Sequence, residues 1–277
     1  MTAATPPARI RLLVSDVDGT LVDKQKQLTP GTIAAVRRLQ AAGVGFTIIS
    51  ARPRSGIMPL ADQLALDVPI GAFNGGIIFR RSGEVIEHHR IDPAVAHGIW
   101  DAIGDAAVDR WVFADDRWYA STDQGPHVGH ERVASAQDPI VTQDFAALLD
   151  RADKITFVSD DEPLLRSLHD RVAPDFGDRA TVVQSQSYYL DVTALQANKG
   201  TGIEELAAAF DTALAETAAI GDQANDLAML DRAGLSIAMG NAPDFVQQRA
   251  DQVTRANDQD GVAHAIDTII LPQGNHA

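Results

Sequence analysis

Short apolar runs alternate with helical spacing along the first third of the chain. Residues 10–15 form a β-rich apolar run that stops at a polar turn, as a buried strand does. Thr29 and Pro30 then supply a capping hydroxyl and a proline suited to the first helical turn, and apolar residues follow at helical spacing. Further strands are predicted over 44–49 and 69–73. This alternation predicts a parallel sheet covered by helices on both faces.

The pattern changes between residues 85 and 189. Paired short strands flank Ser82-Gly83 and Asp115-Asp116, which predicts hairpins and therefore antiparallel pairing. Helix-like and strand-like segments follow in the same region, at 93–103, 154–158, 163–172 and 180–183. We predict a separate α+β module there.

Alternation of strands and helices resumes after residue 190. The predicted strands are 218–220 and 235–239, and the predicted helices are 202–210, 226–230 and 243–250. We therefore predict an α/β fold. Its core is a three-layer, Rossmann-like parallel sheet made of residues 1–84 and 190–277, and an α+β domain at 85–189 is inserted into it.

Composition narrows the range of partners. The chain has 277 residues, with 23 Lys and Arg against 38 Asp and Glu, a net charge of -15. Because nucleic acids and anionic membranes are bound mainly through clustered cations, this charge disfavours both as partners. Cysteine is absent, which excludes a disulfide framework, a thiol nucleophile and a cysteine zinc site. No signal peptide or long apolar run is recognised, so we expect a cytoplasmic protein.

The candidate chemistry lies directly after the predicted core strands. In open parallel sheets the ligand site lies outside the carboxyl ends of the strands. Four polar segments occupy those positions: Asp16-Val17-Asp18-Gly19-Thr20, Ser50-Ala51-Arg52, Asn74-Gly75-Gly76, and Gly221-Asp222 followed by Asn225 and Asp226.

Two of these segments favour a metal. Asp16 and Asp18 are two residues apart at a strand end, which turns both carboxylates to one side, an arrangement that a cation or a shared proton relieves. With Asp222 they form the all-oxygen ligand set that suits Mg²⁺. Simpler explanations remain open at this point: an Asp-Gly turn at 16–19, helix caps at Ser50 and Asp222, and surface cations at Arg52 and Lys199.

The ordered set of motifs resembles a known family. Asp16-Val17-Asp18-Gly19-Thr20, Ser50, Lys199 and Gly221-Asp222-x-x-Asn225-Asp226 are similar to the four motifs of the haloacid dehalogenase-like (HAD) superfamily of phosphohydrolases. Asn74-Gly75, Met239-Gly240-Asn241-Ala242 and Asp260-Gly261-Val262-Ala263 resemble its Cof-type sugar-phosphatase branch, which carries an inserted α+β cap of type IIB. The resemblance covers the whole chain.

The resemblance implies a role for each motif residue. It makes Asp16 the nucleophile and a metal ligand, and Asp18 the general acid and base, which binds Mg²⁺ through its backbone carbonyl. Ser50 holds the transferring phosphoryl group, Lys199 neutralises it and orients Asp16, Asp222 completes the metal ligands, and Asp226 supports the metal site. The residues expected to contact phosphate or substrate are Gly19, Thr20, Ala51, Arg52, Asn74, Gly75, Asn198 and Asn225.

The expected function is a Mg²⁺-dependent phosphatase that acts on small phosphomonoesters, such as sugar, polyol or cofactor phosphates, through an aspartyl phosphate. A phosphotransferase or mutase that uses the same intermediate is one alternative, and a phospho-acceptor signalling module is another. One departure from the family pattern is Ala51, where Gly is common. If a positive φ is needed there, alanine costs on the order of a kcal/mol. Neither the physiological substrate nor the oligomeric state follows from the sequence.

Overall fold

A computed structural model describes residues 9–272 of the chain. These residues divide into two compact units. Unit 1 takes in the described residues up to 50, then 59–86, and those from 198 onward, and unit 2 takes in 51–58 and 87–197. The two units are described separately below.

Unit 1 is built on a five-stranded parallel sheet with the strand order β14-β13-β12-β1-β2. β1 lies in the middle, and all four of its residues are fully buried. Such burial on both faces explains why the strand reads as a continuous apolar run. The strands are β1 (Leu12–Ser15), β2 (Gly45–Ile48), β12 (Thr217–Gly221), β13 (Leu235–Ala238) and β14 (Gln252–Val253).

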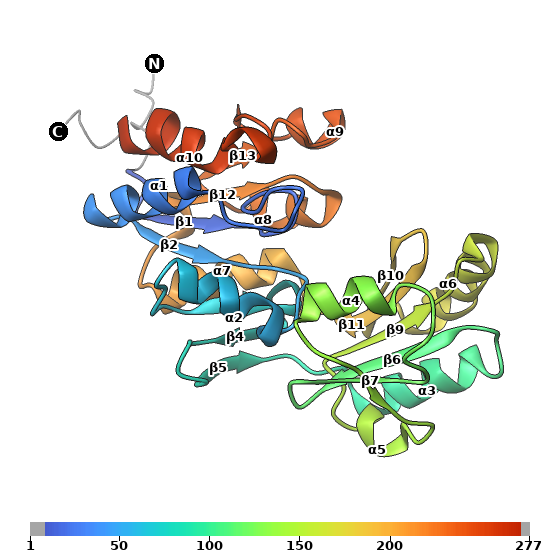
Figure 1. Ribbon diagram of the computed structural model, residues 1–277. Coiled ribbons are helices and arrows are strands. Elements are labelled where there is room, and N and C mark those ends of the chain that lie inside the picture. The colour runs from blue at the N-terminus through green and yellow to red at the C-terminus, as the bar shows by residue number, and fades with distance from the viewer. Residues whose placement is uncertain (1–8, 273–277) are drawn as a thin grey trace. The chain divides into compact units, whose positions relative to one another are not determined.

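Helices cover both faces of this sheet. α1 (Pro30–Ala41) and α10 (Gly261–Ala265) pack together on one face, and α7 (Lys199–Ala209) lies on the other with α8 (Leu227–Leu230) (Figure 1). The α7 side buries alternate residues of the central strands, including Leu12, Val14 and Ala219. The predicted three-layer α/β core is confirmed.

Local sequence explains where the long helices begin. Thr29 accepts a hydrogen bond from the Thr32 amide ahead of Pro30, and Asp92 does the same for the Val95 amide ahead of Pro93. A capping oxygen followed by proline satisfies one free amide and removes another. The remaining segments of unit 1 are β3 (Ile70–Ala72), β4 (Ile77–Phe79), the start of β5 (Val85–His88), part of α2 (Arg54–Gln63) and α9 (Asp244–Gln247), with 3-10 turns at Phe73–Gly75, Leu214–Glu216, Ala224–Asp226 and Asn257–Gln259 and a π-helical turn at Ile266–Ile270.

Unit 2 is an α+β module around a six-stranded sheet with the order β10-β11-β9-β6-β7-β8. Every described pairing in this sheet is antiparallel except that of β7 with β8. α3, α5 and α6 share one apolar core with the sheet. The elements are α3 (Pro93–Ile103), β6 (Asp109–Ala114), β7 (Arg117–Ala120), α4 (Val128–Ser135), β8 (Ile140–Val141), α5 (Ala146–Leu149), β9 (Lys154–Val158), α6 (Glu162–Phe176), β10 (Ala180–Gln186) and β11 (Tyr189–Ala194).

The borders of the units differ from the predicted ones in three places. Residues 85 and 86 group with unit 1 rather than with the inserted module. The chain rejoins unit 1 at Asn198 rather than at 190, because β11 pairs with both β9 and β10 inside the unit 2 sheet. Residues 51–58 group with unit 2, where Ser55 donates to the carbonyl of Ser135 and accepts from Gln137. A side chain at Gly56 would collide with the carbonyl of Ala134, 2.0 Å from the Cβ position.

Across residues 9–272, none of the helices is long and apolar enough to cross a lipid bilayer.

Candidate active site

Two carboxylates meet because their strands are neighbours in register. β1 pairs with β12 so that Ser15 lies beside Ile220, and the amide of Asp16 donates to the carbonyl of Ile220 at 3.0 Å. Asp16 and Asp222 therefore leave the sheet at the same edge. Together with Asp226 they form a group of buried carboxylates with one oxygen each within 4.8 Å of the others.

Lys199 enters this group from the first turn of α7. Asn198 caps the helix by accepting from the Thr201 amide at 3.0 Å, which fixes where the helix begins. The Lys199 side chain is 1% exposed, and its Nζ contacts Asp16 Oδ1 and lies 2.5 Å from Asp226 Oδ1. A surface role for Lys199 is therefore excluded.

Asp226 is held from several directions. Its Oδ2 accepts from the amides of Asp222 and Gln223, both at 2.8 Å, while its Oδ1 accepts from Lys199. The Asp226 side chain thus bonds back to the start of the turn in which it lies, directly after β12, and this fixes the backbone that carries Asp222. Asp226 therefore contacts both the backbone of Asp222 and the lysine that contacts Asp16.

The buried charges of the site do not balance. Burial raises the pKa of Asp16, and the pull of Lys199 offsets only part of that rise. Burial likewise raises the pKa of Asp222 to about 6, and the Asp226 carboxylate adds to the rise. For Lys199, burial opposes the charge, but Asp16 and Asp226 outweigh it and the pKa lies above its usual value. One ammonium thus faces three carboxylates, a donor set that a divalent cation would relieve.

A second layer of polar groups orients Asp222. Thr20 donates to Asp222 Oδ1 at 3.1 Å, and Gln223 and Asn241 donate to Oδ2 at 3.1 and 3.3 Å. Gly19 has a φ of +86°, and a Cβ there would lie 2.3 Å from Asp222 Oδ2. The glycine of the first motif therefore both permits the turn and leaves room for the carboxylate.

Asp18 lies outside the group of three carboxylates. Its Oδ1 is 2.7 Å from Nζ of Lys26, and its side chain is 35% exposed. The carboxylate is therefore more open to water than those of Asp16, Asp222 and Asp226.

Ser50 and the two predicted asparagines Asn74 and Asn225 come together in unit 1. The carbonyl of Ser50 accepts from the Asn74 amide at 2.7 Å, and Asn74 Oδ1 accepts from Asn225 at 3.4 Å. Asn74 has a left-handed backbone, with φ 59° and ψ 27°, which asparagine tolerates better than most residues. Gly75 is buried, and it packs against the helix residue Gly202.

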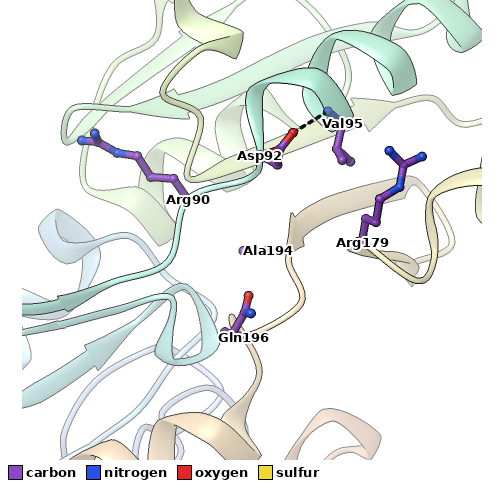
Figure 2. Close-up of a pocket in the computed structure, with 6 residues that line it drawn as sticks. All are labelled: Arg90, Asp92, Val95, Arg179, Ala194 and Gln196. Carbon is purple, nitrogen blue, oxygen red and sulfur yellow. Dashed lines mark hydrogen bonds between the residues drawn. The ribbon is translucent and has the colours of Figure 1, made fainter.

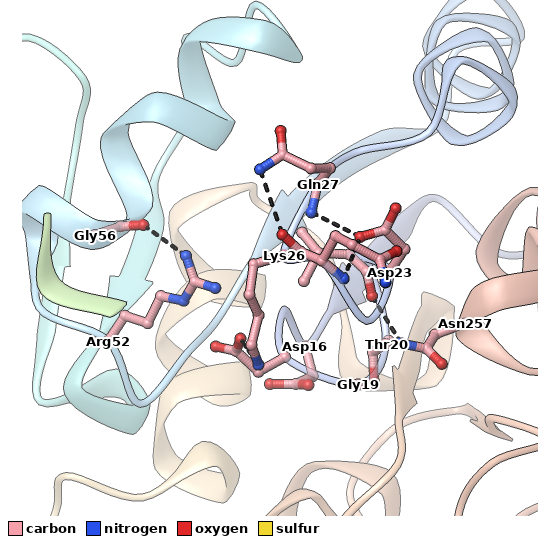
Figure 3. Close-up of polar contacts among 12 residues, drawn as sticks. Asp16, Gly19, Thr20, Asp23, Lys26, Gln27, Arg52, Gly56 and Asn257 are labelled. Carbon is pink, nitrogen blue, oxygen red and sulfur yellow. Dashed lines mark hydrogen bonds and ion pairs between the residues drawn. The ribbon is translucent and has the colours of Figure 1, made fainter. Parts of the chain in front are cut away.

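The structure also describes the other two residues of the second motif, Ala51 and Arg52. Ala51 is not among the described residues with positive φ, so the backbone cost considered for an alanine there is not incurred. Arg52 is buried, and its Nη1 donates to the carbonyl of Gly56 at 3.1 Å (Figure 3). Both residues belong to the segment that groups with unit 2.

Sequence reasoning gave no site role to three polar residues of the site, Gln223, Asn241 and Lys26, although Asn241 stands in one of the motifs that carry the family resemblance. Asn241 follows β13, and its amide also donates to the carbonyl of Gly19 at 2.9 Å. The rule that ligand sites lie at strand ends would have found it. No comparable signal marks Lys26, which reaches Asp18 only through the shape of its loop.

A cavity of about 390 Å³ lies in unit 2 beside the first turn of α3. Figure 2 shows its lining of Arg90, Asp92, Val95, Arg179, Ala194 and Gln196. None of the predicted site residues lines it, and Asp92 is engaged in capping the Val95 amide.

Comparisons with known proteins agree with this geometry. The model of the haloacid dehalogenase-like hydrolases matches residues 13–266. The chain belongs to that family. It is 29% identical over 255 residues to a putative phosphatase of Haemophilus influenzae, covering 91% of this chain and 95% of the relative. It is also 28% identical to the pyridoxal phosphate phosphatase YbhA of Escherichia coli, with coverage of 92% and 97%.

Solved structures give the same assignment. A haloacid dehalogenase-like hydrolase from Bacteroides thetaiotaomicron superimposes with a TM-score of 0.87 at 27% identity, covering 94% of this chain and all of that one. The predicted family, the α/β fold and the predicted enzyme class, a phosphatase, are thereby confirmed.

Proposed function

We propose that this family member is a Mg²⁺-dependent phosphatase that hydrolyses small phosphomonoesters through a phosphoryl group carried on Asp16. The observation that carries the proposal is the contact of Lys199 with Asp16 and Asp226, next to Asp222. A lysine buried in this way holds one carboxylate oxygen in place and keeps positive charge where a phosphate would arrive. Positioning and charge neutralisation are the main requirements of phosphoryl transfer.

The residues present fit a magnesium ion. We assign its ligands to the carboxylates of Asp16 and Asp222 and to the backbone carbonyl of Asp18, as the family resemblance implies. Asp226 is assigned to support, because its oxygens already accept from two amides and from Lys199. When bound, the ion neutralises charge on the phosphate and on the carboxylates.

The proposed reaction has two halves. In the first, an oxygen of Asp16 attacks phosphorus, the phosphorus–oxygen ester bond breaks, and the carboxyl group of Asp18 gives its proton to the leaving alkoxide. In the second, the Asp18 carboxylate takes a proton from a water molecule, whose oxygen attacks phosphorus and expels the Asp16 carboxylate. One difficult displacement is thus split into two easier ones. We assign Ser50, Asn74 and Asn225 as donors to the phosphate oxygens.

The proposed substrates are small phosphorylated metabolites, such as sugar, polyol or cofactor phosphates. A relative named for its action on pyridoxal phosphate supports this size class. The net charge of -15 also disfavours extended polyanions as substrates, whereas a small anion can be held by a local cationic site.

The test is phosphate release from a panel of phosphomonoesters, with Mg²⁺ or with EDTA. Wild type is compared with Asp16→Asn and with Asp191→Asn, a matched change at a buried aspartate of unit 2. We expect Mg²⁺-dependent release that is lost only in Asp16→Asn, with one alcohol formed per phosphate. A substrate labelled with ³²P should leave a hydroxylamine-sensitive label on the wild-type protein. Equal activity of Asp16→Asn and wild type would refute the proposal.

A further inference from the structure

We propose that Lys26 is a positioning residue for Asp18, which it holds in the orientation needed to protonate the leaving group. This inference rests on the proposed function, since it requires Asp18 to act as the general acid. Lys26 lies in the loop between β1 and α1, eight residues after Asp18, and it belongs to none of the four motifs.

The contact itself is well defined. Lys26 Nζ lies 2.7 Å from Asp18 Oδ1, and the two side chains are 39% and 35% exposed. An ion pair this open to water contributes only about 0–1 kcal/mol to stability. Its larger physical effect is geometric: a fixed Oδ1 sets the rotation of the carboxyl group and therefore the direction in which Oδ2 points.

The loop is built to deliver this lysine. Asp23 Oδ1 accepts from the amides of Gln25 and Gln27, both at 2.9 Å, and the Asp23 carbonyl accepts from the Lys26 amide at 3.0 Å (Figure 3). These bonds close a tight turn in which Lys26 has a φ of +61°. Glycine or asparagine would fit that backbone with less strain, and strained non-glycine residues cluster at functional sites.

A second lysine in the same loop supplies the contrast. Lys24 is 69% exposed and pairs with Asp258 at 2.6 Å, so it carries the same charge two residues away without contacting Asp18. Both lysines therefore bring the same positive charge to the loop, but of the two it is Lys26 that contacts the proposed acid, Asp18.

The experiment measures leaving-group dependence. A series of aryl phosphates with similar size is used: p-nitrophenyl, 4-cyanophenyl, phenyl and 4-methoxyphenyl phosphate. Because kcat/KM reports the half-reaction in which the ester bond breaks, loss of acid catalysis lowers it most for the poorest leaving groups. Wild type, Asp18→Asn, Lys26→Asn, Lys26→Arg and Lys24→Asn are compared. Asparagine is chosen at position 26 because it tolerates a positive φ.

We expect Lys26→Asn to lower kcat/KM for 4-methoxyphenyl phosphate about tenfold more than for p-nitrophenyl phosphate. Asp18→Asn should show the same difference between the two substrates, but a larger one. Lys26→Arg should recover most of the loss, and Lys24→Asn should follow wild type. Thermal unfolding and the Mg²⁺ concentration for half-maximal activity should be the same in Lys26→Asn and wild type.

Several outcomes would overturn the inference. A uniform loss in Lys26→Asn across the series would indicate substrate binding or folding instead, and no loss would exclude any role. If wild type and Asp18→Asn share one leaving-group dependence, then the assignment of Asp18 fails, and the role of Lys26 fails with it. If wild type and Asp18→Asn differ but Lys26→Asn matches wild type, only the inference about Lys26 fails.

Discussion

Each unit pairs a lysine with a buried aspartate, and the two clusters differ in their balance of charge. In unit 2, Lys154 pairs with Asp191 one to one at 3.0 Å, and Thr156 and Ser185 donate to the same carboxylate at 2.7 and 2.6 Å. In unit 1, a single buried lysine faces the carboxylates of Asp16, Asp222 and Asp226. The first cluster is satisfied by its own neighbours, and the second carries an excess of negative charge.

We interpret this difference as that between a structural ion pair and the proposed site for a ligand. A buried carboxylate that is fully hydrogen-bonded and matched by one cation has little left to gain from solution. Carboxylates that outnumber their cation gain most from a further positive charge. Burial of an aspartate is therefore a weaker signal of function than the local sum of charge. Four predictions test this distinction, from the largest expected effect to the smallest.

The largest contrast is expected in activity. Asp16→Asn should lower kcat at least about 10⁴-fold, because it removes the proposed nucleophile, whereas Asp191→Asn should stay within about threefold of wild type. Steady-state phosphate release with purified, folded variants measures both. Comparable losses in the two variants would mean that the clusters do not differ in function.

Replacing the lysine of each cluster should lower the free energy of unfolding by different amounts. Lys199→Met leaves two carboxylates without their buried partner and should lower the free energy of unfolding by about 3–5 kcal/mol in the absence of metal. Lys154→Met removes a partly exposed partner from a carboxylate that keeps two hydroxyl donors, and about 1 kcal/mol is expected. Urea denaturation in EDTA measures both values, and equal losses would contradict the comparison.

Magnesium should stabilise the protein in a pH-dependent way. Because burial raises the pKa of Asp222 to about 6 and also raises that of Asp16, the metal-free folded state binds more protons than the unfolded chain. Its stability should therefore fall as pH rises above about 4. Mg²⁺ competes with those protons, so its effect should grow with pH, reaching about 2.7 kcal/mol at a hundredfold excess over its Kd.

Thermal unfolding at pH 5 and pH 8, with Mg²⁺ and with EDTA, tests this prediction. Asp191→Asn serves as the control and should show the wild-type response to Mg²⁺ at both pH values. A Mg²⁺ effect as large at pH 5 as at pH 8 would contradict it.

The smallest effect concerns a glycine pair with matched backbones. Gly19 and Gly83 have φ values of +86° and +93°, so alanine at either position should cost about 1 kcal/mol. A methyl group at 19 would collide with Asp222, whereas the space around 83 is open. Gly19→Ala should therefore raise the Mg²⁺ requirement at least about tenfold, and Gly83→Ala should leave it unchanged. Titration of activity with Mg²⁺ distinguishes them.

Local signals in the sequence predicted most of the core. The capping Thr29 with Pro30, and the apolar strands that end at Asp16 and Asp222, fixed both the elements and the edge of the sheet where the site lies. These features depend on residues close together in the chain. Polar residues at strand ends predicted that Asp16 and Asp222 lie at one edge of the sheet, whereas Lys199 was placed with them only by the family resemblance.

Features that depend on distant packing were not predicted. The predicted division ended the inserted domain at residue 189, whereas residues 190–197 group with unit 2, because β11 pairs with β9 and β10 in a way that its own residues do not reveal. The ion pair of Lys26 with Asp18 depends on one turn closed by Asp23. The cost considered for Ala51 did not arise, because the chain passes that point without a positive φ.

The contact between Gly75 and Gly202 sets a boundary for protein engineering. A Cβ on Gly75 would lie 2.7 Å from the Cα of Gly202, and a Cβ on Gly202 would lie 2.4 Å from Ile49 Cδ1. A larger residue at Gly75 would meet the backbone of the first turn of α7, three residues from Lys199, so that either this turn or the segment around Gly75 would have to shift. Libraries that aim to broaden the range of accepted substrates should keep both glycines fixed and diversify residues elsewhere.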